Sequence, residues 1–206
     1  KNYEFIYFDD LSSYSKAISS LDKSNLTNCP RSKFMETAFP YEVQSPFDND
    51  NEIIGIHPFG SGFAKNAYNQ LNFPEKRISK ECVEKIIKTD KNYLIFGSEK
   101  EILEFDNLKD EPNVCLVAHP EIWVSLSHIQ LCKKVIAVDS SIKTMALVKK
   151  ISTYLIVGDF PDETRDKFFI NPYLDSEYLQ VFLTKNPQKN DKEIIEFVKK
   201  EVYKNN

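Results

Sequence analysis

The sequence predicts an α/β fold, with a Rossmann-like parallel sheet flanked by helices. From residue 50 onward, short apolar runs of strand length alternate with segments of helical periodicity. Residues that favour turns or helix N-caps directly follow several of these runs. Strands that alternate with helices at this spacing are joined by right-handed βαβ crossovers, and such crossovers build a parallel sheet.

The composition excludes some classes of function. The chain has 206 residues, of which 41% are hydrophobic and 28% are charged, which is typical of a soluble globular protein. None of its apolar runs approaches the length of a membrane span. The net charge of -4 argues against nucleic acid as a partner, because phosphate neutralisation needs clustered Lys and Arg.

The cysteines indicate a reducing compartment. Cys29, Cys82, Cys115 and Cys132 are far apart and form no C-x-x-C motif. We therefore expect buried free thiols and a cytoplasmic location. The first residues contain neither the basic region nor the apolar region of a signal peptide, and a chain that starts directly at a strand suggests missing upstream sequence.

The first part of the chain differs from the rest. Residues 3–8 are aromatic and β-branched, and Ser12 or Ser13 can cap a following helix, so this part predicts a partial N-terminal βα segment. Residues 22–50 are polar, contain three prolines and end in the acidic run FDNDNE. We place residues 1–49 at the end of an N-terminal, acceptor-side domain or in a linker, and residues 50–206 in the Rossmann-like domain.

The elements of the second domain follow in order. The predicted strands span residues 53–57, 93–96, 114–118, 135–138 and 153–157. The predicted helices span residues 79–89, 99–105, 121–131 and 191–203, with a further helix after residues 139–141. Residues 168–173 and 178–183 are candidates for short extended segments.

Asp139, Ser140 and Ser141 form the first candidate binding site. They follow the predicted strand 135–138 directly and precede a helix. Ligands of open α/β sheets bind beyond the carboxyl ends of the strands, where a helix N-terminus offers free N–H groups to an anion. The alternative is structural, because these residue types cap many helices that bind nothing.

Several motifs, in this order, give the chain a resemblance to a known family. They are HPFG at residues 57–60, PEKRIS at 74–79, GSE at 97–99, WVSLSHIQLC at 123–132, IAVDSSIKT at 136–144, LIVGD at 155–159 and EIIEFVKK at 193–200. From about residue 52, this order resembles the C-terminal domain of heptosyltransferase-like glycosyltransferases, glycosyltransferase family 9, which have the two-domain GT-B fold. The resemblance covers roughly three quarters of the chain.

The resemblance implies a function in lipopolysaccharide or glycan biosynthesis. The family's C-terminal domain binds a nucleotide-sugar donor. The enzyme moves the sugar to a glycan or lipid-linked acceptor with inversion and without a metal or other cofactor. Peripheral membrane contact through a missing N-terminal domain would be compatible with this function. No nucleic-acid partner is expected.

The resemblance also assigns roles to individual residues. Lys76 would be the catalytic cation that stabilises the pyrophosphate leaving group. Lys65 competes for this role, because it lies in the same loop, just after Ser61 and Gly62. The remaining expected donor-binding residues are Glu99 for the ribose hydroxyls, Asp139 for the turn or the sugar, Ser140 and Ser141 for a second anion site, and Thr144. Glu99 at a helix start is equally explained by the helix dipole.

The chain departs from the family pattern D-[ST]-G-x-x-H at two positions. Ser141 replaces the glycine and Thr144 replaces the histidine. The family's general base lies in the N-terminal domain, and neither Asp9 nor Asp10 can be assigned that role. The alternative function is therefore a non-catalytic GT-B-like binding or assembly module, which would use surface aromatics among the 10 Tyr and 15 Phe.

Two other classes of site are disfavoured by spacing. The three histidines are dispersed and lack carboxylates at metal-ligand spacing, so we predict no metal centre. No G-x-G-x-x-G follows the strand at 53–57, which disfavours NAD or FAD as a cofactor of an unrelated Rossmann-like enzyme.

Overall fold

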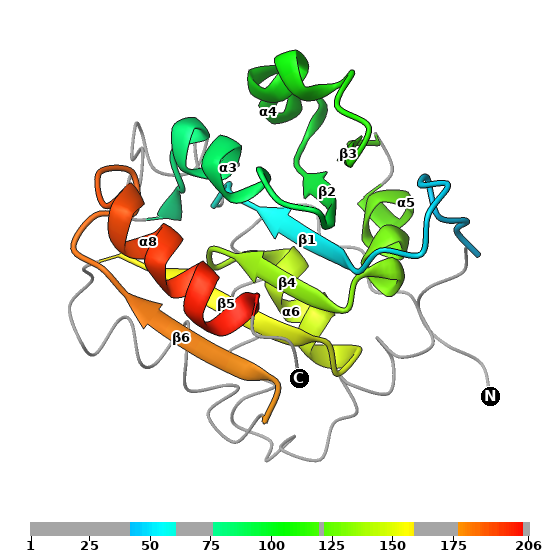
Figure 1. Cartoon of the computed structure of the whole chain (residues 1–206). Coiled ribbons are helices and arrows are strands. Elements are labelled where there is room, and N and C mark those ends of the chain that lie inside the picture. Colours follow the sequence, from blue (N-terminus) through cyan, green and yellow to red (C-terminus); the bar gives the residue numbers. More distant parts are fainter. Residues whose placement is uncertain (1–41, 61–75, 120–121, 159–176, 204–206) are drawn as a thin grey trace, which may run out of the picture. The chain divides into compact units, whose positions relative to one another are not determined.

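The computed structural model describes residues 42–60, 76–119, 122–158 and 177–203 (Figure 1). The chain divides into two compact units, Lys1–Phe34 and Met35–Asn206, and every described residue belongs to the second. The elements predicted at residues 3–8 and 168–173 lie outside the described residues. The domain boundary proposed between residues 49 and 50 stays a prediction.

The described residues form one parallel sheet of six strands, in the order β3-β2-β1-β4-β5-β6 (Figure 1). All five neighbouring pairs are parallel. The strands are β1 (Ile53–His57), β2 (Asn92–Phe96), β3 (Val114–Val117), β4 (Lys134–Ala137), β5 (Ser152–Val157) and β6 (Leu179–Leu183). The predicted α/β class and Rossmann-like sheet are confirmed.

The strand predictions are confirmed to within one residue at each end. The central strands are buried on both faces, which is why they appear in the sequence as continuous apolar runs and not as alternating patterns. Of the two candidate extended segments near the C-terminus, residues 178–183 contain β6, which pairs with β5 at the edge of the sheet.

Several predicted helices end earlier or change type. The α-helices are α3 (Lys80–Ile86), α4 (Glu99–Ile102), α5 (Ile122–Ser127), α6 (Ser141–Val148) and α8 (Asp191–Phe197). Three continue as other helical turns: α4 as the 3-10 helix η4 (Leu103–Leu108), α5 as the 3-10 helix η5 (His128–Leu131), and α8 as the π-helix η8 (Val198–Val202). Apolar periodicity persists through such turns, so the sequence predicted one longer α-helix in each case.

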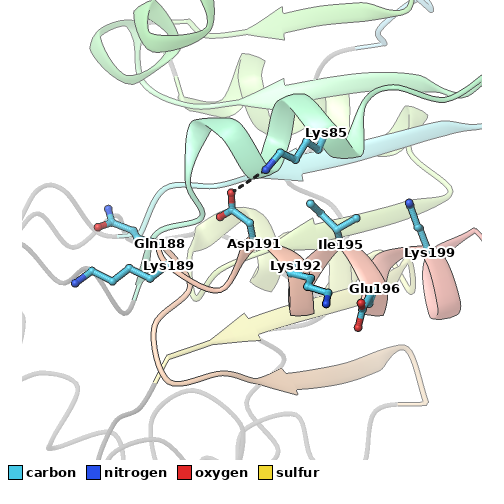
Figure 2. A pocket seen from close by; sticks show the side chains of 8 residues that line it. All are labelled: Lys85, Gln188, Lys189, Asp191, Lys192, Ile195, Glu196 and Lys199. Atoms are coloured by element: carbon cyan, nitrogen blue, oxygen red, sulfur yellow. Dashed lines mark ion pairs between the residues drawn. The ribbon is translucent and has the colours of Figure 1, made fainter.

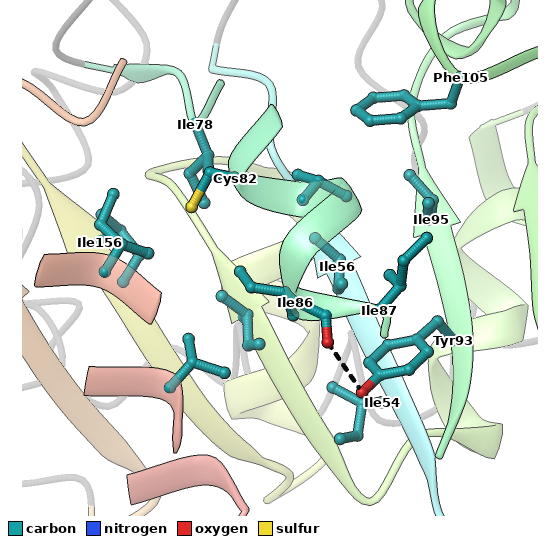
Figure 3. Close-up of a cluster of buried hydrophobic side chains, with 14 of the residues drawn as sticks. Ile54, Ile56, Ile78, Cys82, Ile86, Ile87, Tyr93, Ile95, Phe105 and Ile156 are labelled. Carbon is teal, nitrogen blue, oxygen red and sulfur yellow. Dashed lines mark hydrogen bonds between the residues drawn. The ribbon is translucent and has the colours of Figure 1, made fainter. Parts of the chain in front are cut away.

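The helices cover the sheet in two layers (Figure 1). On one face, α3, η4, α8 and η8 pack over Ile54, Ile56 and Ile136 (Figure 3). On the other face, α5, η5 and α6 pack over Leu94, Phe96 and related side chains. Because each layer closes an apolar face of the sheet, the polar loops gather at the strand ends.

Helices α3 and α8 are joined at both of their ends. At the first, the Ser79 hydroxyl donates to Asp191 Oδ1 at 2.7 Å. At the second, the Tyr203 hydroxyl at the end of η8 donates to the Ile86 carbonyl at 2.7 Å. The Tyr93 hydroxyl of β2 donates to the same carbonyl at 3.3 Å (Figure 3). The two helices therefore form one surface layer.

The prediction of buried free thiols is confirmed for two of the three described cysteines. Cys82 and Cys132 are buried, Cys115 is half-buried, and all three are free. Burial raises the pKa of the Cys82 thiol to about 12. Cys29 lies outside the described residues. No helix within the described ranges has the length and apolarity needed to cross a membrane.

Asn113 closes the turn between α3 and β2, and its loss should destabilise the fold. Its Nδ2 atom lies 3.3 Å from the Ile87 carbonyl, 3.3 Å from the Thr89 carbonyl and 3.1 Å from the Lys91 carbonyl. We expect Asn113→Ala to lower the free energy of unfolding by about 1–3 kcal/mol, because half-buried carbonyls lose their donor. Urea unfolding followed by circular dichroism measures this.

Asn107→Ala is the matched control. The Asn107 amide donates to Glu84 on the surface, so its removal should change the free energy of unfolding by less than about 0.5 kcal/mol. Equal losses in the two variants would contradict the role assigned to Asn113.

Candidate functional site

The strand order creates a topological switch point between β1 and β4. From β1 the chain leads to α3 on one face of the sheet, and from β4 it leads to α6 on the other face. The two strands are neighbours, and the Val138 amide donates to the His57 carbonyl at 3.2 Å. Ligands of this class of fold bind at such a point, beyond the carboxyl ends of the strands.

Lys76 is held at this switch point by backbone pairing of its neighbours with the residues after β1. Phe59 and Arg77 form an antiparallel bridge, and the Ile78 amide donates to the Pro58 carbonyl at 3.0 Å. A Cβ atom on Gly60 would lie 2.3 Å from Lys76 Cβ, so only glycine allows this close approach. The segment before α3 therefore returns to the end of β1 and brings Lys76 with it.

Lys76 meets the turn after β4. Its Nζ atom lies 3.0 Å from Asp139 Oδ2, and Lys143 Nζ lies 2.5 Å from Asp139 Oδ1. The exposed fractions of the side chains are 13% for Lys76, 20% for Asp139 and 3% for Lys143, so water screens these contacts only in part. Two residues that are 63 positions apart in the sequence thus share one site.

Lys143 was missed by the sequence analysis. It follows Asp139 by four residues, the spacing at which opposite charges on a helix meet. That spacing could have identified it, but it lies in an apolar helix face, where a lysine is not expected to be buried.

The start of α6 has the geometry of an anion site. Ser140 is the N-cap, and its hydroxyl accepts from the Lys143 amide at 3.3 Å. The Thr144 amide bonds to the Ser140 carbonyl, which leaves the amides of Ser141 and Ile142 as the donors that an anion could use. Ser141 is exposed and Asp139 is half-buried.

The other predicted site residues are not brought into this contact. Glu99 is exposed at the first position of α4, and the capping box there is made by Ser98 and Glu101. The Thr144 hydroxyl donates to the Ser140 carbonyl at 3.3 Å, which is a helix-internal bond. Three further predicted residues lie outside the described residues: Ser61, Gly62 and Lys65.

His57 lies at the end of β1, at the switch point of the sheet. The residue is half-buried, but its Nδ1 atom is inaccessible to water and accepts no hydrogen bond from the described residues. Burial lowers the pKa of the imidazole to about 3, so the ring is neutral near pH 7. Phe59 packs edge-on against it, with 6.2 Å between the ring centroids.

The described residues contain no group of three or more His, Cys, Asp or Glu side chains that could hold a metal ion. What the site does offer is a carboxylate between two ammonium groups and the N-terminus of a helix. This arrangement can bind and orient an anion.

Protonation of His57 should make the fold sensitive to acid. The unfolded state gains a proton as the pH falls below 6.5, but the folded state resists protonation down to about pH 3. The free energy of unfolding must therefore decrease as the pH is lowered through this window. Between pH 7 and 5, we expect His57→Gln to lose about 1–2 kcal/mol less than the unmodified chain, by urea titration at each pH. An unchanged pH dependence would contradict this.

Comparisons with known proteins bear on the fold. Neither a family model nor a curated protein sequence matches the chain. Solved structures do match. The glycosyltransferase family 9 protein of Veillonella parvula superposes with a TM-score of 0.50 and 15% identity, over 77% of this chain and 40% of that one. The ADP-heptose lps heptosyltransferase II of E. coli superposes with a TM-score of 0.51 and 18% identity, over 82% of this chain and 50% of that one.

The chain therefore spans about half the length, or less, of the glycosyltransferases that it matches. At these identities the likeness concerns the fold. The chain has the Rossmann-like fold of these glycosyltransferase structures, as its motifs predicted.

Proposed function

We propose that this chain is the donor-binding part of a glycosyltransferase that moves a sugar from a nucleotide-diphosphate donor to a glycan or lipid-linked acceptor. Its transfer is inverting and metal-independent, and it takes place in the cytoplasm. The proposal rests on the fold shared with glycosyltransferases and on one geometric observation. Lys76 and the start of α6 come from separate parts of the sequence and meet at the switch point of the sheet.

The chemistry of a nucleotide-sugar donor suits this arrangement. When the bond from the anomeric carbon to the diphosphate breaks, its electron pair moves to a phosphate oxygen, and negative charge grows there. A fixed ammonium group at that position stabilises the charge without reorganising at the moment of reaction. Lys76 supplies this group, and the amides of Ser141 and Ile142 supply a second contact to the diphosphate.

Asp139 forms ion pairs with both Lys76 and Lys143. As the shared partner of both ammonium groups, it fixes their positions in the absence of donor. A diphosphate that entered would add oxygen ligands around ammonium groups that are already in place, which lowers the entropy cost of binding. The acceptor hydroxyl then attacks the anomeric carbon from the opposite face and gives its proton to a general base of the acceptor-side domain.

Titration with nucleoside diphosphates tests the donor site. We titrate the full chain in EDTA with ADP, UDP, GDP and CDP, and we expect calorimetry to detect binding of at least one of them. Lys76→Ala should raise its Kd tenfold or more, which corresponds to about 1.4 kcal/mol. Lys133→Ala, a change of the same type at an exposed residue, should leave the Kd within a factor of about two. Absence of binding at millimolar nucleotide would refute the donor site.

Gly60→Ala tests the position of Lys76 without removing its charge. The added Cβ would displace the Lys76 segment, because it would lie 2.5 Å from the Lys76 carbonyl oxygen. We expect a loss of nucleotide affinity close to that of Lys76→Ala, with the secondary structure intact by circular dichroism. Unchanged affinity would show that the place of Lys76 beside β1 does not matter for binding.

A non-catalytic binding module is the second candidate. It is supported by Thr144, which stands where the family pattern has histidine and whose hydroxyl donates to the Ser140 carbonyl. The aromatic interface expected for this alternative is not seen among the described Tyr and Phe residues, which are buried or half-buried. The exposed large apolar residues of the described part are Leu103 and Leu183. Nucleotide binding without turnover of any sugar nucleotide would favour the module.

A further inference from the structure

A groove runs along the outer surface of α3 and α8, away from the residues of the candidate donor site. It consists of two hollows of about 530 and 320 Å³ that share Lys85, Ile195 and Lys199. Figure 2 shows the lining side chains along α8, from Gln188 and Lys189 at one end to Lys199 at the other. The lining residues of the groove contain neither Lys76 nor Asp139.

The groove is basic, although the chain as a whole carries a net charge of -4. Five lysines line it, against two carboxylates: Lys85, Lys88, Lys189, Lys192 and Lys199, with Asp191 and Glu196. Lys85 pairs with Asp191 at 3.6 Å (Figure 2). Across the described ranges, the other four lysines make no ion pair, and all four are exposed. Such a concentration of like charge favours an anionic occupant.

The floor of the groove is apolar. Ile195 is half-buried between Lys192 and Lys199, and the second hollow is also lined by Ile86 and Val198. An occupant that fills the groove must therefore place apolar groups on the isoleucine and negative groups beside the lysines. Polyphosphate has negative groups only, and it would leave the floor uncovered and bring its charge close to Glu196.

Nucleic acid and a lipid surface fit less well. Single-stranded nucleic acid binds on open aromatic side chains, but the aromatic residue of this groove, Tyr203, uses its hydroxyl to bond the Ile86 carbonyl within the helix layer. Arginine, the side chain suited to bidentate phosphate contacts, does not line either hollow. A membrane surface is flat on this scale and would bridge a hollow without filling it.

We propose that this groove docks a short acidic segment of a partner protein, in which carboxylates flank one or two aliphatic side chains. The aliphatic groups cover Ile195, and the carboxylates pair with Lys192 and Lys199 along α8 and η8 and with Lys88, which follows α3. From Asp191 to Lys199 the helical rise is roughly 12 Å, which matches about four residues of extended peptide. The two helices are tied together at both ends, so the groove is preformed.

Selection from a displayed library of dodecapeptides tests the proposal on the full chain. We expect peptides enriched on the chain to share Asp or Glu on both sides of Leu, Ile or Val. A synthetic peptide of that sequence should bind in fluorescence anisotropy, and its Kd should rise when salt is increased. Enrichment of peptides without acidic residues, or of none, would overturn the proposal.

Charge-matched variants locate the binding. Lys192→Glu with Lys199→Glu should raise the Kd of the selected peptide at least tenfold. Lys100→Glu with Lys133→Glu makes the same charge change at exposed residues outside the groove and should raise the Kd less than threefold. Equal losses in the two double variants would show that net charge and not the groove binds the peptide, and would overturn the proposal.

The variant Ile195→Ser distinguishes binding of a peptide from binding of a simple polyanion. It should weaken the selected peptide several-fold in a variant whose thermal unfolding is unchanged to within a few degrees. Inorganic polyphosphate, oligothymidylate and phosphatidylglycerol vesicles serve as competitors. The proposal is overturned if any of them displaces the peptide at a lower concentration than the unlabelled peptide itself does, or if Ile195→Ser leaves peptide binding unchanged.

Discussion

The ion pairs of Asp139 are the interaction on which the candidate site depends. Its carboxylate receives Lys76 from the loop after β1 and Lys143 from the next turn of α6. Without Asp139, two ammonium groups at low exposure would lose a shared counter-charge, which is unfavourable in a partly desolvated site. The carboxylate therefore helps to hold two cations at the switch point, and the sheet order places it there.

The sheet imposes the second constraint. Because β1 and β4 are neighbours and their following helices cover opposite faces, the loops after these strands diverge. The close approach of Gly60 to Lys76 then ties the end of a long loop back to β1. His57 stays neutral in the same region, so the positive charge of the candidate site comes from lysine side chains and the helix N-terminus.

The two sites on the described part of the chain use lysine in different ways. At the switch point, Lys76 and Lys143 are mostly buried and paired, so their positions are fixed. In the groove of α3 and α8, the lysines are exposed beside an aliphatic floor. The first arrangement suits a small, well-defined anion such as a diphosphate. The second suits a flexible segment whose charges can find several partners.

The sequence by itself determined the α/β class, the five strands read as apolar runs and the turn after β4, because buried strands and helix caps leave local patterns. It also gave Lys76 as a candidate, through its resemblance to a family. Only the tertiary structure decided that Lys76 meets Asp139, that Lys143 joins them, and that α3 and α8 form a basic groove. Some of these contacts join residues that are far apart in the chain, and others involve a helix face whose burial depends on its neighbours. Local sequence patterns do not encode either kind of contact.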